Sequence, residues 1–448
     1  MGDKVFRDPL YNYIIIDKSV DGWLLDLLDT REAQRLRRIH QLGVSNYTYS
    51  GADHNRFAHT MGVLHLMQMV MNHLQRRDPS ATDGAARDAL LAAAVVHDVG
   101  HGPFSHLFEP CLGINHEKWS IATALDPDSQ VNDVLKRRDK YLPQHVAELI
   151  DEDNHEHPSW QKALLSSQLD VDRLDYLRRD SLFTGAGYGH FDWHRLLTTV
   201  EFDGDRPNEA DLVWPAKAAL AIEEYIFARF YMYQNVYLHK TTRGFEQLLQ
   251  AMWKRATNLR SDGVDVCAVP VLAEFWRHEK PSPGSFPVAA YLNIEEFTVL
   301  SQIQVWQDHS DKPLADLARR FLCRDGFAMI PAPAGENRLE SGGDSEWLKA
   351  LREVVAETGF DDPDAYCLFD DVAGKYRRPY KPESKEQQTA GTAIRIKVEG
   401  EAKPIEISEY LPRLGAVTRL PPPMRVYYVP KEARHAADRL RREWSPSV

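Results

Sequence analysis

Cysteines are few in this sequence, and none of them is spaced for a cross-link or a metal site. Four of the 448 residues are cysteines, and they stand far apart at Cys111, Cys267, Cys323 and Cys367. Disulfide frameworks and cysteine-based zinc sites place their cysteines in pairs at short, regular spacings. The scatter therefore argues against both kinds of site and indicates a protein of a reducing compartment.

Long apolar runs are also lacking. The sequence contains no stretch of about 18 apolar residues, the length that a membrane-spanning helix needs, and its amino-terminal residues do not have the pattern of a secretory signal.

Lysine and arginine number 54 against 66 aspartates and glutamates, so the net charge is -12. We therefore expect a cytoplasmic protein with no membrane partner and no nucleic-acid-coating role, although a local basic pocket stays open.

Two common motifs of nucleotide and ester chemistry are missing from the sequence. It has no Gly-x-x-x-x-Gly-Lys-Ser/Thr phosphate loop and no Gly-x-Ser-x-Gly nucleophile turn. The glycine-rich residues 185–189 follow a helical pattern rather than a strand, so they indicate a tight connection.

The residues that are present predict a mainly α-helical fold with two or three lobes. Hydrophobic residues make up 43% of the chain, enough to bury large cores. Helical periodicity runs from about residue 20 to residue 260, with an amphipathic helix at residues 56–74 and a buried one at residues 85–96. We expect a helical core at residues 1–265 and a smaller α+β lobe at residues 266–448.

The expected carboxyl-terminal lobe is helical to about residue 330 and then mixed with short strands. Residues 392–399 alternate at Ile394, Ile396 and Val398, which is typical of a strand. Residues 405–407 and 425–429 have a similar character. We expect both of these to pair with residues 392–399.

The most informative stretch is residues 97–106, directly after the buried helix. It holds three histidines, His97, His101 and His106, together with Asp98. Buried imidazoles and carboxylates are costly unless they are paired or bind a metal. A metal or phosphate site therefore explains the cluster better than core packing does.

Further ligands must come from elsewhere in the chain. His59 lies on the amphipathic helix, and residues 169–180 alternate acidic and basic side chains in a helical pattern. Asp172, Tyr176 and Asp180 share one stripe of that helix. A solvated, salt-bridged helix explains the alternation equally well at this point.

In this order, the residues resemble the HD superfamily of metal-dependent phosphohydrolases, whose ligands are a His, a His-Asp pair and a distant Asp. The matching positions are His59, His97, Asp98 and Asp172. Residues 34–43, 55–59, 97–106 and 170–180 together resemble, more narrowly, the deoxynucleoside triphosphate (dNTP) triphosphohydrolases. That resemblance covers about residues 1–330 and implies an HD-domain helical core.

The ligand set suits one divalent metal ion. Two imidazoles and two carboxylates fit Mn, Fe, Zn or Ni better than Mg, which prefers oxygen ligands, and Mg stays open. Such an ion lowers the pKa of bound water and polarises a phosphoryl oxygen. The leaving group still needs a proton, which histidine can deliver near neutral pH. The resemblance implies a second, activating Mg as well.

The resemblance also assigns roles around the metal. His106 is the expected general acid, supported by His101, His116 and Glu117. The expected phosphate-contacting cations are Arg56, Arg173 and Arg229, and Tyr176 is expected beside the phosphates. Asp180 is the carboxylate expected to bind the 3'-hydroxyl, and Tyr237 is the tyrosine expected against C2'. Gln41 and Leu42 are expected to border the sugar.

Some enzymes of this kind bind a regulatory guanine nucleotide, GTP or dGTP, between subunits. Lys4, Asp29, Gln34 and Arg37 resemble that site. A basic helix whose arginines pair with acidic neighbours is the simpler alternative. A homo-oligomer, tetramer or dimer, is expected from the same resemblance.

The resemblance implies a metal-dependent hydrolysis of dNTPs to deoxynucleoside and inorganic triphosphate. Two alternatives stay open. One is another HD phosphohydrolase, which acts on a nucleoside monophosphate, a cyclic nucleotide or a modified nucleotide. The other is a non-catalytic nucleotide sensor that keeps the fold, and its expected signature, a missing metal ligand, is not found.

Overall fold

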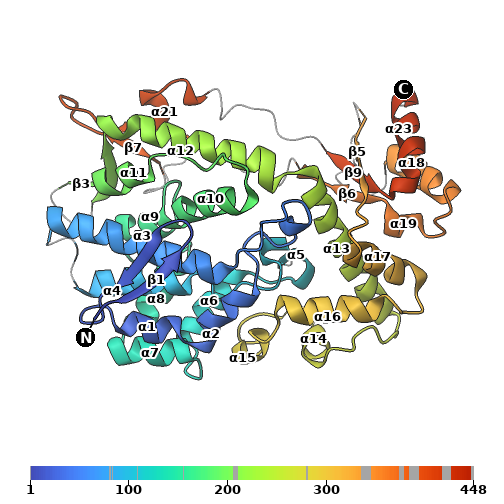
Figure 1. The fold of residues 1–448 in the computed structure, drawn as a ribbon, viewed down its shortest axis with the longest axis horizontal. Helices are drawn as coiled ribbons and strands as arrows, with labels where there is room; N and C mark the ends of the chain where they lie inside the picture. The colour runs from blue at the N-terminus through green and yellow to red at the C-terminus, as the bar shows by residue number, and fades with distance from the viewer. Residues whose placement is uncertain are drawn as a thin grey trace.

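Helices account for most of the molecule, as the periodicity predicts (Figure 1). The structure is a computed structural model. It describes residues 2–79, 82, 84–107, 109–154, 156–204, 210–278, 281–333, 336, 345–372, 378–382, 393–415 and 425–444.

The α-helices are α1 (Trp23–Leu28), α2 (Arg31–Arg35), α3 (Arg56–Arg77), α4 (Gly84–Val96), α5 (Glu109–Leu112), α6 (His116–Leu125), α7 (Gln130–Arg138), α8 (Leu142–Ile150), α9 (Ser159–Leu165), α10 (Val171–Thr184), α11 (Trp193–Thr199), α12 (Ala219–Met232), α13 (Lys240–Ser261), α14 (Pro270–Trp276), α15 (Val288–Tyr291), α16 (Glu296–Trp306), α17 (Lys312–Leu322), α18 (Glu346–Glu357), α19 (Pro363–Tyr366), α21 (Ile407–Tyr410) and α23 (Arg434–Glu443). The strands are β1 (Lys4–Asp8), β2 (Asn12–Ile16), β3 (Glu201–Asp203), β4 (Asp211–Pro215), β5 (Ala328–Pro331), β6 (Leu368–Asp370), β7 (Arg395–Lys397), β8 (Ile405–Glu406) and β9 (Val426–Val429). Short 3-10 turns lie at Leu36–Arg38, Ser45–Tyr47, Ser105–Leu107, Ala216–Ala218 and Lys431–Ala433, and a π-helical turn lies at Tyr233–Tyr237.

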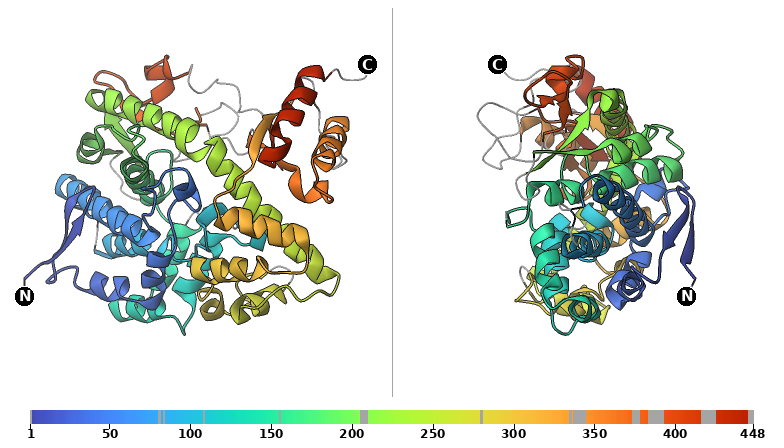
Figure 2. Two further views of the ribbon diagram at one scale, coloured as in Figure 1. Left: turned by 45° about the vertical axis from the view of Figure 1, so that its right-hand side comes forward. Right: turned by 90° about the vertical axis from the view of Figure 1, so that its left-hand side faces the viewer.

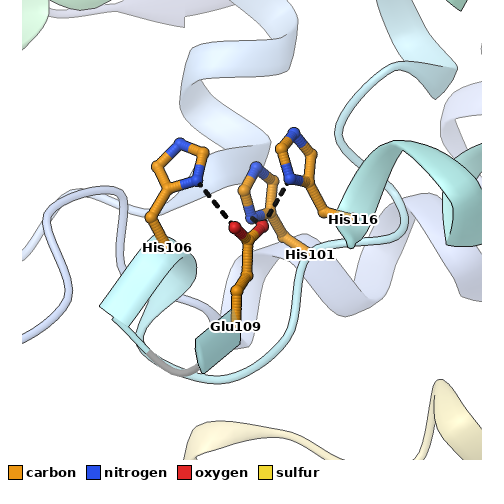
Figure 3. A group of neighbouring side chains, drawn as sticks. All are labelled: His101, His106, Glu109 and His116. Atoms are coloured by element: carbon orange, nitrogen blue, oxygen red, sulfur yellow. Dashed lines mark hydrogen bonds and ion pairs between the residues drawn. The ribbon is translucent and has the colours of Figure 1, made fainter. Parts of the chain in front are cut away.

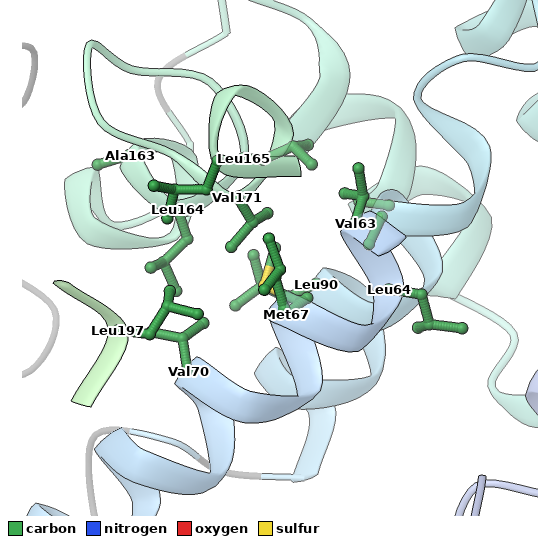
Figure 4. Packing of buried hydrophobic residues seen from close by; sticks show 14 of the residues in the cluster. Val63, Leu64, Met67, Val70, Leu90, Ala163, Leu164, Leu165, Val171 and Leu197 are labelled. Atoms are coloured by element: carbon green, nitrogen blue, oxygen red, sulfur yellow. The ribbon is translucent and has the colours of Figure 1, made fainter. Parts of the chain in front are cut away.

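The N-terminal core is the buried apolar cluster that runs from Ile14 to Val236 and also includes Tyr380, Ile394, Ile396, Ile407 and Leu414. Its centre is α4, whose residues from Ala89 to Val96 are all buried. Side chains of α3, α9, α10 and α11 pack around it (Figure 4). The Asn55 side chain begins α3 because it accepts a hydrogen bond from Ala58 N, as a capping residue does.

The C-terminal core is the second buried cluster, in which α13, α16 and α17 pack with β5, β6 and β9. It also receives Val44, Phe104, Leu107 and Trp119 from the first third of the chain. Figures 1 and 2 show α13 running from the end of α12 into this second part of the molecule. The two cores therefore meet along the segment that follows α4.

The described strands form three small sheets, ordered β1-β2, β3-β4-β7-β8 and β5-β9-β6. The predicted pairing of residues 405–407 with residues 392–399 is confirmed, because Ile396 lies opposite Ile405. The pairing predicted for residues 425–429 is wrong. Strand β9 lies between β5 and β6, with Tyr427 opposite both Ile330 and Phe369, because its four consecutive apolar residues are all buried in the C-terminal core.

The predicted fold class, a mainly α fold with a smaller α+β region, is confirmed. Residues after 266 contribute to both cores, since β7 pairs in parallel with β4 at Trp214 and Ile396. Figure 1 shows β7 and α21 beside α12, far from the other late elements. The boundary at residue 265 stays a prediction. No helix among the described residues is both long enough and apolar enough to cross a membrane.

Core burial gives a first test of this arrangement. Leu90 on α4 is completely buried, whereas Leu220 on α12 is 61% exposed. We expect Leu90→Ala to destabilise the protein by about 2 to 5 kcal/mol, because it removes buried methyl groups and leaves a cavity. Leu220→Ala is the matched control and should change stability by less than about 0.5 kcal/mol. Equal shifts of the urea midpoint in the two variants would contradict the position of α4.

Candidate metal centre

Four side chains from three segments meet at the predicted metal site. His59 lies on α3, His97 and Asp98 follow α4, and Asp172 lies in the first turn of α10. His59 Nε2 is 2.9 Å from Asp172 Oδ1 and 3.7 Å from Asp98 Oδ2. His97 Nε2 is 3.5 Å from Asp98 Oδ1 and 3.8 Å from Asp172 Oδ1. The structure thus brings together all four residues that the sequence nominates as ligands.

The donor atoms of this cluster fit a divalent metal ion. His59 is completely buried and His97 largely so, yet the Nε2 atom of neither makes a hydrogen bond among the described residues. A buried nitrogen without a partner is costly unless a ligand engages it. Both atoms lie within a few ångströms of the carboxylates. Two imidazoles with carboxylate oxygens suit a first-row divalent ion.

The turn that carries His97 and Asp98 depends on Gly100. A Cβ atom at Gly100 would lie 2.1 Å from His116 O and 2.4 Å from Ser120 N, so only glycine allows α6 to approach. Ser120 Oγ donates to His97 O at 2.6 Å and accepts from Gly100 N at 2.9 Å. The backbone of the turn is thereby fixed to α6.

Asp175 is a site residue that the sequence reasoning missed. It is completely buried on α10, and its Oδ2 atom lies 2.8 Å from His59 Nδ1. Burial alone would raise the pKa of Asp175, but Arg179 and His59 outweigh burial and hold that pKa well below its usual range. Its position three residues after Asp172 was visible in the sequence; its partner was not.

A second group of side chains lies beside the cluster, formed by His101, His106, Glu109 and His116 (Figure 3). The rings of His101 and His116 stack with their centroids 3.8 Å apart. Glu109 accepts hydrogen bonds from His116 Nδ1 and, at 3.4 Å, from His106 Nδ1. Burial lowers the pKa of His101 and of His116. His106, with a side chain 67% exposed, is the imidazole of this group that solvent reaches.

His101 links the two groups. Its Nε2 atom is 3.3 Å from Asp98 Oδ1, and its Nδ1 atom is buried without a hydrogen bond among the described residues. Arg56 reaches Asp98 from the other side, with Nη1 2.6 Å from Oδ2. Although burial alone would raise it, Arg56 and His97 hold the pKa of Asp98 well below its usual value. Asp98 therefore stays an anion.

The loop that contains Phe104 and Ser105, between His101 and His106, has an unusual backbone. Phe104 and Ser105 both adopt φ of +57°, a left-handed conformation that costs a non-glycine residue about 1 to 2 kcal/mol. Ser105 Oγ accepts from Arg56 Nε and donates to His40 O, both at 2.7 Å. Glu296 accepts from Phe104 N at 3.1 Å. These bonds hold the strained loop in place.

The segment of residues 291–296 supports the same turn from the C-terminal core. Tyr291 Oη donates to Gly100 O at 2.6 Å. Arg35, which is almost completely buried, donates to His101 O at 2.6 Å and to Ile294 O at 2.7 Å. The metal-site turn is therefore held by residues nearly 200 positions further along the chain.

Two of the predicted sugar-side residues, Asp180 and Tyr237, are in contact, and His54 connects them to Gln41. Asp180 accepts from Tyr237 Oη at 2.8 Å through Oδ2, and its Oδ1 atom lies 2.7 Å from His54 Nε2. The Tyr176 ring lies 6.3 Å from that of Tyr237 and 6.5 Å from that of His59. Gln41 and Leu42 stand next in the chain to His40, and Gln41 N donates to His54 O at 3.0 Å. His54 is a second residue that the sequence reasoning missed.

The predicted phosphate-contacting cations have partners of their own. Arg173 pairs with Asp170, the residue that caps α10, so part of the salt-bridged-helix alternative holds at this position. Arg229 Nη1 donates to Pro379 O at 3.1 Å. The Nε atoms of Arg173 and Arg229 are both buried without a hydrogen bond in the described part of the chain.

The four residues predicted for a regulatory nucleotide lie in two places. Asp29 ends α1, and Gln34 donates to Leu28 O at 2.9 Å and accepts from Arg37 Nε at 2.7 Å. Lys4 is exposed on β1. Their predicted role is an expectation that these contacts do not test.

Comparison with known proteins places this site in a family. Residues 56–180 match the HD domain model. The uncharacterized protein YwfO of Bacillus subtilis is 35% identical over 386 residues, which is 86% of this chain and 83% of that protein. The chain belongs to the HD-domain family.

Two further relatives carry an activity in their names. The deoxynucleoside triphosphate triphosphohydrolase SAMHD1 of Gallus gallus is 28% identical over 286 residues, which is 56% of this chain and 45% of that protein. The crystal structure of a phosphohydrolase from Bacteroides thetaiotaomicron superposes with a TM-score of 0.74 at 25% identity, covering 96% of this chain and 100% of that one. The HD-domain match contains His59, His97, Asp98 and Asp172, and the family supports a metal-dependent phosphohydrolase.

Glu117 lies near the second histidine group and gives a test by pH. Burial, followed by the charges of Glu152 and Glu109, raises its pKa to about 7. Its pKa in the unfolded chain is about 4.3, so the folded state prefers the protonated form. Ionisation of Glu117 therefore costs stability, and this cost grows as the pH rises from about 4 to about 7.

We expect Glu117→Gln, which cannot ionise, to raise the urea midpoint at pH 8 and to leave it nearly unchanged at pH 4.5. Glu401→Gln, at an exposed position, is the matched control and should have no effect at either pH. A Glu117→Gln midpoint below that of the wild type at pH 8 would contradict the assigned environment.

Proposed function

We propose that this chain hydrolyses dNTPs to deoxynucleoside and inorganic triphosphate at the His59, His97, Asp98 and Asp172 centre. The observation that carries the proposal is that the buried Nε2 atoms of His59 and His97 both face the carboxylates of Asp98 and Asp172. The similarity to a dNTP triphosphohydrolase supports the substrate class.

These four side chains would hold one divalent ion, Mn, Fe, Zn, Ni or Mg, with a second activating Mg as part of the same proposal. When bound, the ion supplies a Lewis acid and a water of lowered pKa. Arg56 fixes Asp98 through the 2.6 Å contact. The remaining steps depend on side chains of the chain itself.

The leaving 5'-oxygen needs a proton, and His106 is the proposed donor. It is the exposed imidazole of its group, and Glu109 orients its Nδ1–H. His101, His116 and Glu117 line the same side. Burial lowers the pKa of His101 and of His116, which favours neutral imidazoles and leaves His106 as the proton donor of the group.

Binding of the triphosphate is assigned to cations that converge despite the acidic chain. Arg56, Arg173 and Arg229 would meet its negative charge, and the free Nε–H groups of Arg173 and Arg229 support this role. Tyr176 completes the phosphate side.

Recognition of the deoxyribose is assigned to Asp180 and Tyr237. The Asp180 carboxylate, which Tyr237 and His54 already position, would accept a hydrogen bond from the 3'-hydroxyl. The Tyr237 ring would then occupy the space next to C2'. Gln41 and Leu42 border the sugar in this proposal.

The proposal includes activation by GTP or dGTP at Lys4, Asp29, Gln34 and Arg37, in a homo-oligomer. The contact between Arg37 and Gln34 supports a shared site for the latter two. Dimer or tetramer, and a cytoplasmic location, stay predictions.

Product analysis tests the proposed reaction. The purified full-length protein is incubated with each of the four dNTPs and Mn, with and without GTP or dGTP, and the products are separated by chromatography. We expect intact tripolyphosphate and the deoxynucleoside. The His97→Ala, Asp98→Ala double variant should fall to the background rate. Orthophosphate or pyrophosphate from the wild type would instead identify another kind of HD phosphohydrolase.

A leaving-group comparison tests His106. We expect His106→Ala to lower kcat for dNTPs by about 10²- to 10⁴-fold, because it removes the proton donor. The loss should shrink with an aryl triphosphate, whose phenolate leaves without a proton. The control is His194→Ala, at an exposed position of α11, which should keep the wild-type rate. Equal losses on both substrates would exclude general acid catalysis by His106.

A further inference from the structure

A chain of hydrogen bonds runs from the turn of the amino-terminal hairpin to the metal centre. Tyr11 Oη donates to Asp175 Oδ1 at 2.8 Å, and Asp175 Oδ2 accepts from His59 Nδ1 at the same distance. His59 is the α3 member of the nominated ligand set. The hairpin of β1 and β2, at the edge of the molecule in Figure 2, is thus two hydrogen bonds from the metal site.

Arg179 closes this chain into a network. It donates to both oxygens of Asp175, from Nε at 2.8 Å and from Nη2 at 2.9 Å, and its Nη1 donates to Asp8 Oδ2 at 2.9 Å. The other oxygen of Asp8 accepts from Leu10 N at 2.8 Å and from Tyr11 N at 3.0 Å. Asp175 and Arg179 are completely buried. Each charge in the network is therefore paired inside the fold.

The surrounding structure leaves space for this network. A Cβ atom at Gly62, one turn after His59 on α3, would lie 1.8 Å from Asp175 Oδ1 and 2.6 Å from Arg179 Nη2. Tyr11 is held by the rings of His65, 4.9 Å away, and Trp193, 5.7 Å away. The position of its hydroxyl is thus set by α3 and α11 together.

The network determines which nitrogen of His59 can bind a metal. Because Asp175 is a carboxylate that only accepts, Nδ1 must donate, and the lone pair of the neutral ring is then on Nε2. That atom points toward Asp98 and Asp172. A carboxylate behind a metal-binding histidine orients the ring and increases its basicity.

We propose that Asp175, held by Tyr11 and Arg179, is a positioning residue of the metal centre, so that the turn of the amino-terminal hairpin sets its metal affinity. This inference rests on the proposed metal site. It assigns to residues 8–11, which stand outside the HD-domain match, a part in the chemistry of that domain.

Metal titration of the full-length protein tests the inference. The protein is stripped with a chelator, and Co²⁺ binding is followed by its visible absorption and by competition with a chromophoric chelator. We expect Asp175→Asn to weaken Co²⁺ binding by about 10- to 100-fold. Tyr11→Phe, which removes one hydroxyl from the network, should weaken it by about 2- to 10-fold. Both variants should shift the Co²⁺ spectrum.

The matched control is Tyr428→Phe on β9, which removes a hydroxyl that donates to Lys240 O at 2.9 Å in the C-terminal core. It should bind Co²⁺ as the wild type does. Circular dichroism of the metal-free proteins shows which variants fold, and if Asp175→Asn does not, Tyr11→Phe alone decides. Wild-type affinity and spectrum in a folded Tyr11→Phe would overturn the inference, as would equal weakening in Tyr428→Phe. A wild type that binds no Co²⁺ would overturn the metal site itself.

Discussion

Three carboxylates and two imidazoles share the space between α3, α4 and α10, and burying them imposes the main constraint on the surrounding structure. An ion moved from water into a protein interior costs several kcal/mol unless partners compensate it. Arg56 pairs with Asp98, Arg179 pairs with Asp175, and Asp172 lies against His59. The Nε2 atoms of His59 and His97 both face the Asp98 and Asp172 carboxylates, and His97 Nε2 makes no hydrogen bond among the described residues. Charge balance therefore explains both the pairs that are complete and the position left for a cation.

The rest of the site is arranged in layers around this charge cluster. The N-terminal core supplies rigid helices, and glycines at two positions allow them to approach: Gly62 leaves room for Asp175, and Gly100 leaves room for α6. The C-terminal core contributes Tyr291, Ile294 and Glu296 to the same turn and loop. Ligands fixed in this way lose little conformational entropy when an ion binds. The residues behind the ligands therefore increase the affinity for the metal.

Local sequence patterns predicted the structural features that depend on residues close together in the chain. The periodicity of α3 and α4 was readable because it depends on neighbours in the chain, whereas the set His59, His97, Asp98 and Asp172 was nominated by its resemblance to the HD superfamily. The partner of β9 was not, since a strand of four apolar residues can pair with any sheet that buries it. Asp175 was not predicted as a site residue for a related reason. Its spacing from Asp172 was visible, but its meaning depends on Tyr11, 164 residues away. The pairing of Arg173 with Asp170 was anticipated only as an alternative.

The contacts of Arg35 also bear on when the site can form during synthesis. The whole HD-domain match ends at residue 180, so the ribosome has made every nominated ligand well before it reaches Ile294. Arg35 joins His101 O to Ile294 O, and Tyr291 bonds to Gly100 O. The nascent chain therefore holds all of the ligands, and the α6 contacts of their turn, before the contacts from Tyr291 and Ile294 can form.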